Sequence, residues 1–135
     1  MGRTFGMIKV SVVKQSNYPV GAAKIKKKLA DFLVAQGITS DAEVSIAIVG
    51  EKKMMDLGRT YLKDKILHNV LSFTPTEVKG NFVYPNDGLL HLGEIVICFP
   101  KVVSEAKSED VLIDDKVYEL VEHGALHLLG IHHKE

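Results

Sequence analysis

Apolar positions follow two periods along the chain, and the two periods alternate. Short runs rich in β-branched residues are typical of strands, and they are separated by stretches in which apolar residues return every three or four positions, as on one face of a helix. The predicted strands span residues 8–13, 42–49, 69–73 and 91–98. The predicted helices are one that ends near Gly37 and three that span about 50–62, 100–108 and 113–129. This alternation predicts one sheet with helices packed on it, in an α/β or α+β domain.

The segment 74–90 interrupts the alternation, because prolines and glycines recur in it. These residues favour turns over strands or helices. We therefore expect an exposed, hairpin-like excursion, across which the strands 69–73 and 91–98 pair with each other. Long excursions of this kind often carry function or order around a ligand.

Length and composition restrict the class of protein. The chain has 135 residues, enough for one domain with a core, so residues 1–135 are expected to form a single domain. Apolar residues make up 46% and charged residues 25%, as in ordinary globular proteins, and no apolar run reaches the length of a membrane span. The start lacks a secretory signal and Cys98 is the single cysteine, so we expect a cytoplasmic protein. Because the net charge is zero, any contact with RNA requires a local site.

Four of the six histidines lie between residues 123 and 133, and three of them have the spacing of metal ligands. His123 and His127 are four apart, so on a helix both rings lie on one face. Gly130 favours the left-handed conformation that ends a helix and brings in a third imidazole. His133 is the preferred third ligand, and its neighbour His132 is the alternative. We therefore expect a metal site at the end of the C-terminal helix.

Three imidazole ligands with an open fourth position are typical of a catalytic zinc site. A zinc ion lowers the pKa of a water in that position towards ~7, so hydrolysis is the expected chemistry. Metzincin proteases share the ligand spacing but carry a glutamate directly after the first histidine, where this chain has Gly124. Cleavage of a phosphodiester is therefore favoured over cleavage of a peptide, because a metal ion can hold the charge that builds up on phosphoryl oxygens.

The stretch from His123 to His133 resembles the HGxLHLxGxDH motif of the YbeY family, single-metal endoribonucleases and ribosomal RNA maturation factors. Residues 70–73 and 92–97 resemble two further strand motifs of that family, in the same order. The resemblance implies an α+β fold with a small mixed four-stranded sheet packed against helices, and a zinc ion (Zn2+) held by His123, His127 and His133. It also implies a role in maturation and quality control of small-subunit (16S) rRNA. The expected partners are single-stranded rRNA and the small ribosomal subunit, with no membrane and no DNA.

The chain departs from the family pattern at positions that bear on substrate binding. The family has an arginine, thought to hold RNA phosphate, where this chain has Leu62, and it has aspartates where this chain has Asn69 and His132. The candidates for contact with the substrate in place of that arginine are Arg59, Lys63 and His68.

Two further residues are candidates for the catalytic site, beside the three histidines. Glu94 stands where the family has an aspartate, and its carboxylate could accept a proton or orient water. The hydroxyl of Ser72 is expected to hydrogen-bond in the cleft. The alternative interpretations are an ordinary carboxylate at the sheet edge and a hydroxyl that caps local backbone.

The sequence favours a cytoplasmic, zinc-dependent endoribonuclease that cleaves single-stranded rRNA. A ribosome-assembly factor with a mainly structural metal site and weakened catalysis is the alternative, motivated by Leu62, Asn69 and His132. A zinc hydrolase acting on another substrate is the third possibility. It predicts little dependence on salt, whereas binding to RNA phosphates weakens steeply as salt rises.

Overall fold

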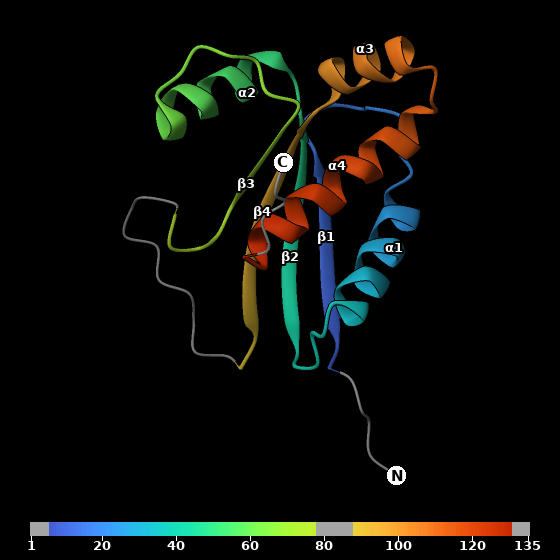
Figure 1. Ribbon diagram of the computed structural model, residues 1–135, viewed down its shortest axis with the longest axis vertical. Coiled ribbons are helices and arrows are strands. Elements are labelled where there is room, and N and C mark those ends of the chain that lie inside the picture. Colours follow the sequence, from blue (N-terminus) through green and yellow to red (C-terminus); the bar gives the residue numbers. More distant parts are fainter. Residues whose placement is uncertain (1–5, 78–87, 131–135) are drawn as a thin grey trace.

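All four predicted strands are present in the computed structural model, which describes residues 6–77 and 88–130 (Figure 1). The strands are β1 (Ile8–Lys14), β2 (Ala42–Val49), β3 (Val70–Phe73) and β4 (Leu90–Cys98). They form one mixed sheet in the order β1-β2-β4-β3. β2 runs parallel to both β1 and β4, whereas β3 runs antiparallel to β4 and forms an edge. The predicted pairing of two strands across the excursion is thereby confirmed.

The helices also lie where the sequence predicts them, with one difference. They are α1 (Ala22–Ala35), α2 (Glu51–Leu57), α3 (Phe99–Glu109) and α4 (Ile113–Leu128). The end of the predicted helix 50–62 is instead a wider π-helical turn, η1 (Gly58–Leu62), which ends at Lys63 in the left-handed conformation. π-Helical turns are rare and occur frequently at functional sites. None of the helices in the described residues has both the length and the apolar character needed to cross a membrane.

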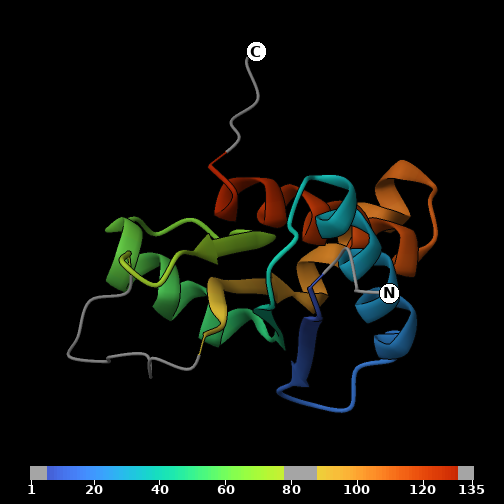
Figure 2. The same cartoon turned by 90° about the horizontal axis from the view of Figure 1, so that it is seen from below.

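Helices cover the two faces of the sheet unequally. α1 and α4 pack on one face and build the main core there, in which Ile46 of β2 and Ile95 of β4 are fully buried (Figure 2). The opposite face carries a smaller cluster in which Met54 of α2 packs near Val96 and Cys98 of β4. Alternate residues of β4 therefore belong to different cores, as the period of a strand requires. The prediction of an α+β domain with a small mixed sheet packed against helices is confirmed.

Two glycines allow α4 and β3 to approach β4 closely. A Cβ on Gly124 of α4 would lie 2.9 Å from Cγ2 of Ile95. Gly93 of β4 has a φ of 132°, and a Cβ there would lie 2.2 Å from the backbone oxygen of Phe73. Both contacts require a residue without a side chain. They place α4 and the edge strand β3 next to each other across the end of the sheet.

Candidate active site

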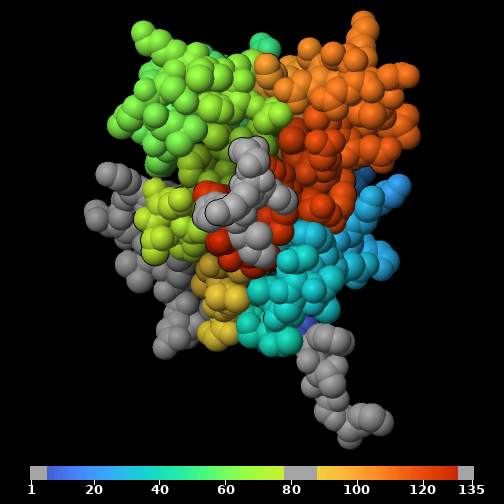
Figure 3. All heavy atoms as spheres, viewed as in Figure 1, coloured from blue at the N-terminus to red at the C-terminus, as the bar shows by residue number. Residues whose placement is uncertain are grey.

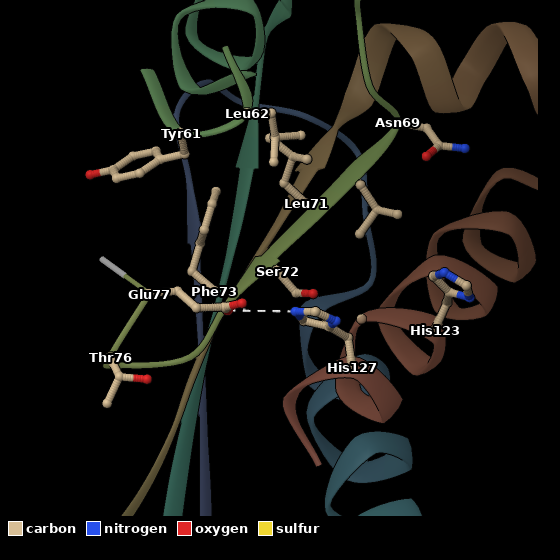
Figure 4. Close-up of a pocket in the computed structure, with 12 residues that line it drawn as sticks. Tyr61, Leu62, Asn69, Leu71, Ser72, Phe73, Thr76, Glu77, His123 and His127 are labelled. Carbon is tan, nitrogen blue, oxygen red and sulfur yellow. Dashed lines mark ion pairs between the residues drawn. The ribbon is translucent and has the colours of Figure 1, made fainter. Parts of the chain in front are cut away.

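His123 and His127 line one cavity between α4 and β3 (Figure 4). Both belong to α4 and lie one turn apart, as their spacing predicts. The cavity, which we call the histidine cavity, has a volume of about 630 Å³ and is also lined by η1, β3, Thr76 and Glu77. This volume lies within the range of about 300–1,000 Å³ that is usual for ligand sites. In Figure 3 the green segment from α2 to β3 lies beside the orange and red surface of α3 and α4.

β3 brings Ser72 to the side of the cavity that faces α4. Its neighbours Leu71 and Phe73 pack in the smaller core, so Ser72 points to the opposite side by the alternation of a strand. In Figure 4 the hydroxyl of Ser72 points towards His127. Ser72, His123 and His127 are therefore predicted site residues that the structure brings together.

Glu77 lines the cavity although it is not among the site residues that the sequence predicts. Its Oε1 lies 3.5 Å from Nε2 of His127 (Figure 4). The backbone N–H of Thr74 donates to the same oxygen at 2.8 Å, and this hydrogen bond lowers the pKa of Glu77 and keeps it ionised. The Glu77 N–H donates in turn to the Thr74 carbonyl at 3.0 Å. The sequence does contain a signal for this turn, because Thr74-Pro-Thr-Glu77 has the spacing of a capping box.

The part of the cavity lining that comes from η1 and from the side of β3 away from α4 is apolar (Figure 4). It consists of Tyr61 and Leu62 from η1 and Leu71 and Phe73 from β3, and we call these four residues the apolar wall. The rings of Tyr61 and Phe73 lie 5.0 Å apart at an angle of 52°. Such tilted pairs are a favourable arrangement of aromatic rings. The histidine cavity thus has one polar, imidazole-bearing side and one aromatic side.

The three predicted substrate-binding residues do not line the histidine cavity. Nη1 of Arg59 lies 3.1 Å from Oδ1 of Asp56, an exposed pair on α2 and η1. Nε2 of His68 lies 2.9 Å from Oδ2 of Asp64, and this pair packs against Gly58. Lys63 is exposed. The structure therefore keeps these side chains apart from Ser72 and the two histidines.

Glu94 lies on the other face of the sheet from the histidine cavity. Its neighbour Ile95 packs in the main core under α4, so the side chain of Glu94 points away from α4. Glu94 pairs in register with Ser45 of β2 and is exposed. The structure does not bring this predicted catalytic residue together with His123 and His127.

The predicted third metal ligand, His133, and its alternative His132 lie outside the described residues. α4 ends as the sequence predicts, because Gly130 has a φ of 78° in the left-handed region. Within residues 6–77 and 88–130, no three His, Cys, Asp or Glu side chains form a group that could hold a metal ion. Of the predicted ligands, His123 and His127 lie within the described residues. Two imidazoles on one helical face, followed by the left-handed glycine that ends the helix, fit the donor chemistry of zinc.

The fold resembles that of a protein whose structure has been solved. The solution structure of TM1509 from Thermotoga maritima aligns with this chain at a TM-score of 0.58 and 24% sequence identity. The alignment covers 95% of this chain and 75% of that protein.

Sequence comparisons identify the family. The family model described as Endoribonuclease YbeY matches residues 11–135. A protein named Endoribonuclease YbeY from Stutzerimonas stutzeri is 38% identical over 97 residues, which span 72% of this chain and 58% of that protein. The protein of the same name from Roseiflexus castenholzii is 31% identical over 128 residues, or 95% of this chain and 80% of that protein. The chain therefore belongs to the YbeY family of endoribonucleases.

Proposed function

We propose that this chain is a metal-dependent endoribonuclease that cleaves single-stranded RNA. The observation that carries the proposal is the placement of His123 and His127 on one face of α4, inside a cavity beside the edge strand β3. Membership of a family whose curated members are named endoribonucleases adds support. The proposed cellular substrate is small-subunit (16S) rRNA, during its maturation and quality control in the cytoplasm, as the family resemblance implies.

The proposed cofactor is one zinc ion held by His123, His127 and His133. When bound, such an ion stabilises the negative charge that develops on phosphoryl oxygens during cleavage. The carboxylate of Glu77, next to His127, orients that imidazole. The hydroxyl of Ser72 offers a hydrogen bond to the substrate from the β3 side of the cavity. Glu94 has no part in this arrangement, because it lies on the other face of the sheet.

The test of this proposal removes both described ligands. The variant His123→Ala/His127→Ala is expected to lose stoichiometric zinc, measured by metal analysis of the purified protein, and to lose cleavage of a single-stranded rRNA fragment. His91→Gln is the matched control, because His91 pairs with Glu43 on the face of the sheet away from α4. Undiminished cleavage by the metal-free double variant would contradict the proposal, provided that a mock purification shows no contaminating nuclease.

A ribosome-assembly factor with weak catalysis is the second candidate, and one observation favours it. Among the described residues that line the histidine cavity there is no lysine or arginine, and Leu62 stands where the family arginine is expected. If the metal site is mainly structural, the double histidine variant should lose thermal stability while its affinity for small-subunit RNA remains unchanged. Thermal melting and RNA binding of the same preparations separate the two candidates.

A further inference from the structure

Tyr61 is held in place on the apolar wall before any ligand binds. Its ring is partly buried and packs against Phe73, which is 6% exposed. Both Tyr61 and its neighbour Leu62 belong to the π-helical turn η1, and both line the cavity. A ring that is already fixed loses little conformational entropy when a ligand stacks on it.

The apolar wall also exposes surface to the cavity. Leu62 is 47% exposed, although it is a large aliphatic side chain. Covering apolar surface is favourable by about 25 cal/mol for each Å² removed from water. A ligand that covers Leu62 and the accessible part of Tyr61 therefore gains free energy from this wall.

The charges of the cavity decide which part of an RNA can make that contact. The described lining residues include Glu77 and no lysine or arginine, so none of these side chains offers a lysine or arginine ion pair to a phosphate. Beside the proposed metal ion, the described lining side chains can therefore add affinity for an RNA segment through its bases and sugars. Bases of single-stranded RNA are unstacked and bind by stacking on aromatic side chains.

We infer that Tyr61 is the stacking platform for one nucleobase of the RNA substrate, and that Leu62 covers the edge of the same base. The base belongs to a nucleotide next to the phosphodiester that faces His123 and His127 across the cavity. Tyr61 is thereby a substrate-binding residue, and the subsite accepts any base because every base has a π-face. This inference rests on the proposed endoribonuclease function and identifies how its site holds RNA with no lysine or arginine among the described lining residues.

A scan with abasic nucleotides tests the stacking directly. A cleaved single-stranded RNA is synthesised with one abasic nucleotide, which is moved stepwise across the cleavage site, and KM and kcat are measured for each RNA. For the wild-type chain we expect KM to rise about 10-fold at one position, with kcat little changed. Tyr61→Leu should raise KM about 10-fold for the unmodified RNA and show no further rise at that position. Tyr61→Phe keeps the ring and should behave like the wild type.

A second aromatic pair provides the matched control. Tyr18 stacks on Phe99 at 4.7 Å, away from the histidine cavity. Tyr18→Leu should lower thermal stability without changing the abasic profile. If Tyr61→Leu melts below the assay temperature, Tyr61→Met fills similar space without a π-system and takes its place.

The outcomes separate this inference from the proposed function. If the abasic nucleotide raises KM equally in the wild type and Tyr61→Leu at every position, or if Tyr61→Phe is as impaired as Tyr61→Leu, the stacking platform is overturned. Cleavage by the wild type in that case leaves the endoribonuclease proposal intact. A wild-type chain that neither cleaves the RNA nor binds it, as measured by fluorescence anisotropy, overturns both.

Discussion

Gly124 of α4 lies against Ile95 of β4 so closely that a Cβ on Gly124 would be 2.9 Å from Cγ2 of Ile95. Ile95 is fully buried and cannot move aside without disturbing the main core. Gly124 directly follows His123 and precedes His127 by three positions. The contact therefore sets how close both imidazoles lie to the sheet. In the sequence, Gly124 stands where metzincin proteases carry a glutamate. In the structure, the same residue allows α4 to pack closely on β4.

Gly124→Ala is expected to lower the free energy of unfolding by about 1 kcal/mol. Overpacking a core lowers the free energy of unfolding by about 1–3 kcal/mol. The higher helix propensity of alanine relative to glycine offsets about 1 kcal/mol of this loss. Urea denaturation measures the change. Ile95→Ala alone opens a cavity that the added methyl group partly fills, so the double variant should be more stable than the sum of the single effects. Strict additivity would contradict the contact.

The buried lysine of α4 provides a prediction about stability. Nζ of Lys116, whose side chain is 6% exposed, lies 3.0 Å from both carboxylate oxygens of Glu109 and 3.4 Å from Oε2 of Glu119. Lys116→Met keeps the buried stem and removes the charge. It is expected to lower the free energy of unfolding by about 1–2 kcal/mol, and not by more, because solvent can still reach both glutamates. Lys27→Met removes the surface pair with Asp31 and should cost less than about 0.5 kcal/mol.

The same pair predicts how stability depends on pH. The hydrogen bond with Glu109 raises the pKa of Lys116 in the folded chain above its ordinary value. A raised lysine pKa contributes stability that is complete below the unfolded pKa of about 10.4 and is lost as pH rises through the folded pKa. The stability advantage of the wild type over Lys116→Met should therefore be constant from neutral pH to about pH 10 and shrink above it. Burial raises the pKa of Tyr118 to about 12, but this group titrates in both proteins.

Local patterns in the sequence predict most of the fold and the placement of His123 and His127 on one helical face. Helix and strand periods depend on near neighbours, so the predicted elements and the shared face of His123 and His127 follow from spacing alone. The ending of α4 at Gly130 follows from the conformational freedom of glycine. The helical period does not predict the π-helical turn η1, at whose first residue, Gly58, the side chains of Asp64 and His68 pack.

The rest of the site depends on which face of the sheet α4 covers. The run Ile95-Val-Ile-Cys98 is apolar at every position, so alternation alone does not tell which residues face α4. The sequence pattern therefore does not exclude the predicted position of Glu94 beside the histidines. The structure puts it on the other face. Glu77 meets His127 only through the tertiary packing of the turn after β3 on α4. Contacts of this kind have no local sequence period.

Replacing Glu77 is expected to lower the affinity of the chain for zinc. Glu77→Gln keeps the shape of the side chain and removes the negative charge 3.5 Å from Nε2 of His127. Loss of a group that orients a metal ligand typically lowers affinity at least 10-fold, so we expect zinc affinity to fall by about 10-fold in a competition titration with a chelator. Glu51→Gln, on the exposed start of α2, is the matched control. Equal zinc affinity of the two variants would show that Glu77 does not orient His127.

Leu62 lies in the histidine cavity at the position where the family has an arginine, so Leu62→Arg tests how the chain holds RNA. An added cation that reaches a phosphate releases counterions from a single strand. The slope of log K against log salt should therefore become steeper by about 0.7 for this one contact. Leu62→Gln, polar but uncharged, is the control and should leave the slope unchanged.

Cleavage by the Leu62→Arg variant distinguishes the two candidate functions. If the wild type is an assembly factor with weakened catalysis, kcat/KM for single-stranded RNA should rise in Leu62→Arg. The reason is that the wild type then lacks a cation that binds the RNA phosphate, and the variant supplies one. If the apolar wall already holds the substrate, kcat/KM should not rise at moderate salt, because the arginine replaces the apolar contact of Leu62 with the base, and the abasic profile should keep its one sensitive position at Tyr61. A slope that stays the same in Leu62→Arg would mean that residue 62 does not meet a phosphate in the bound RNA.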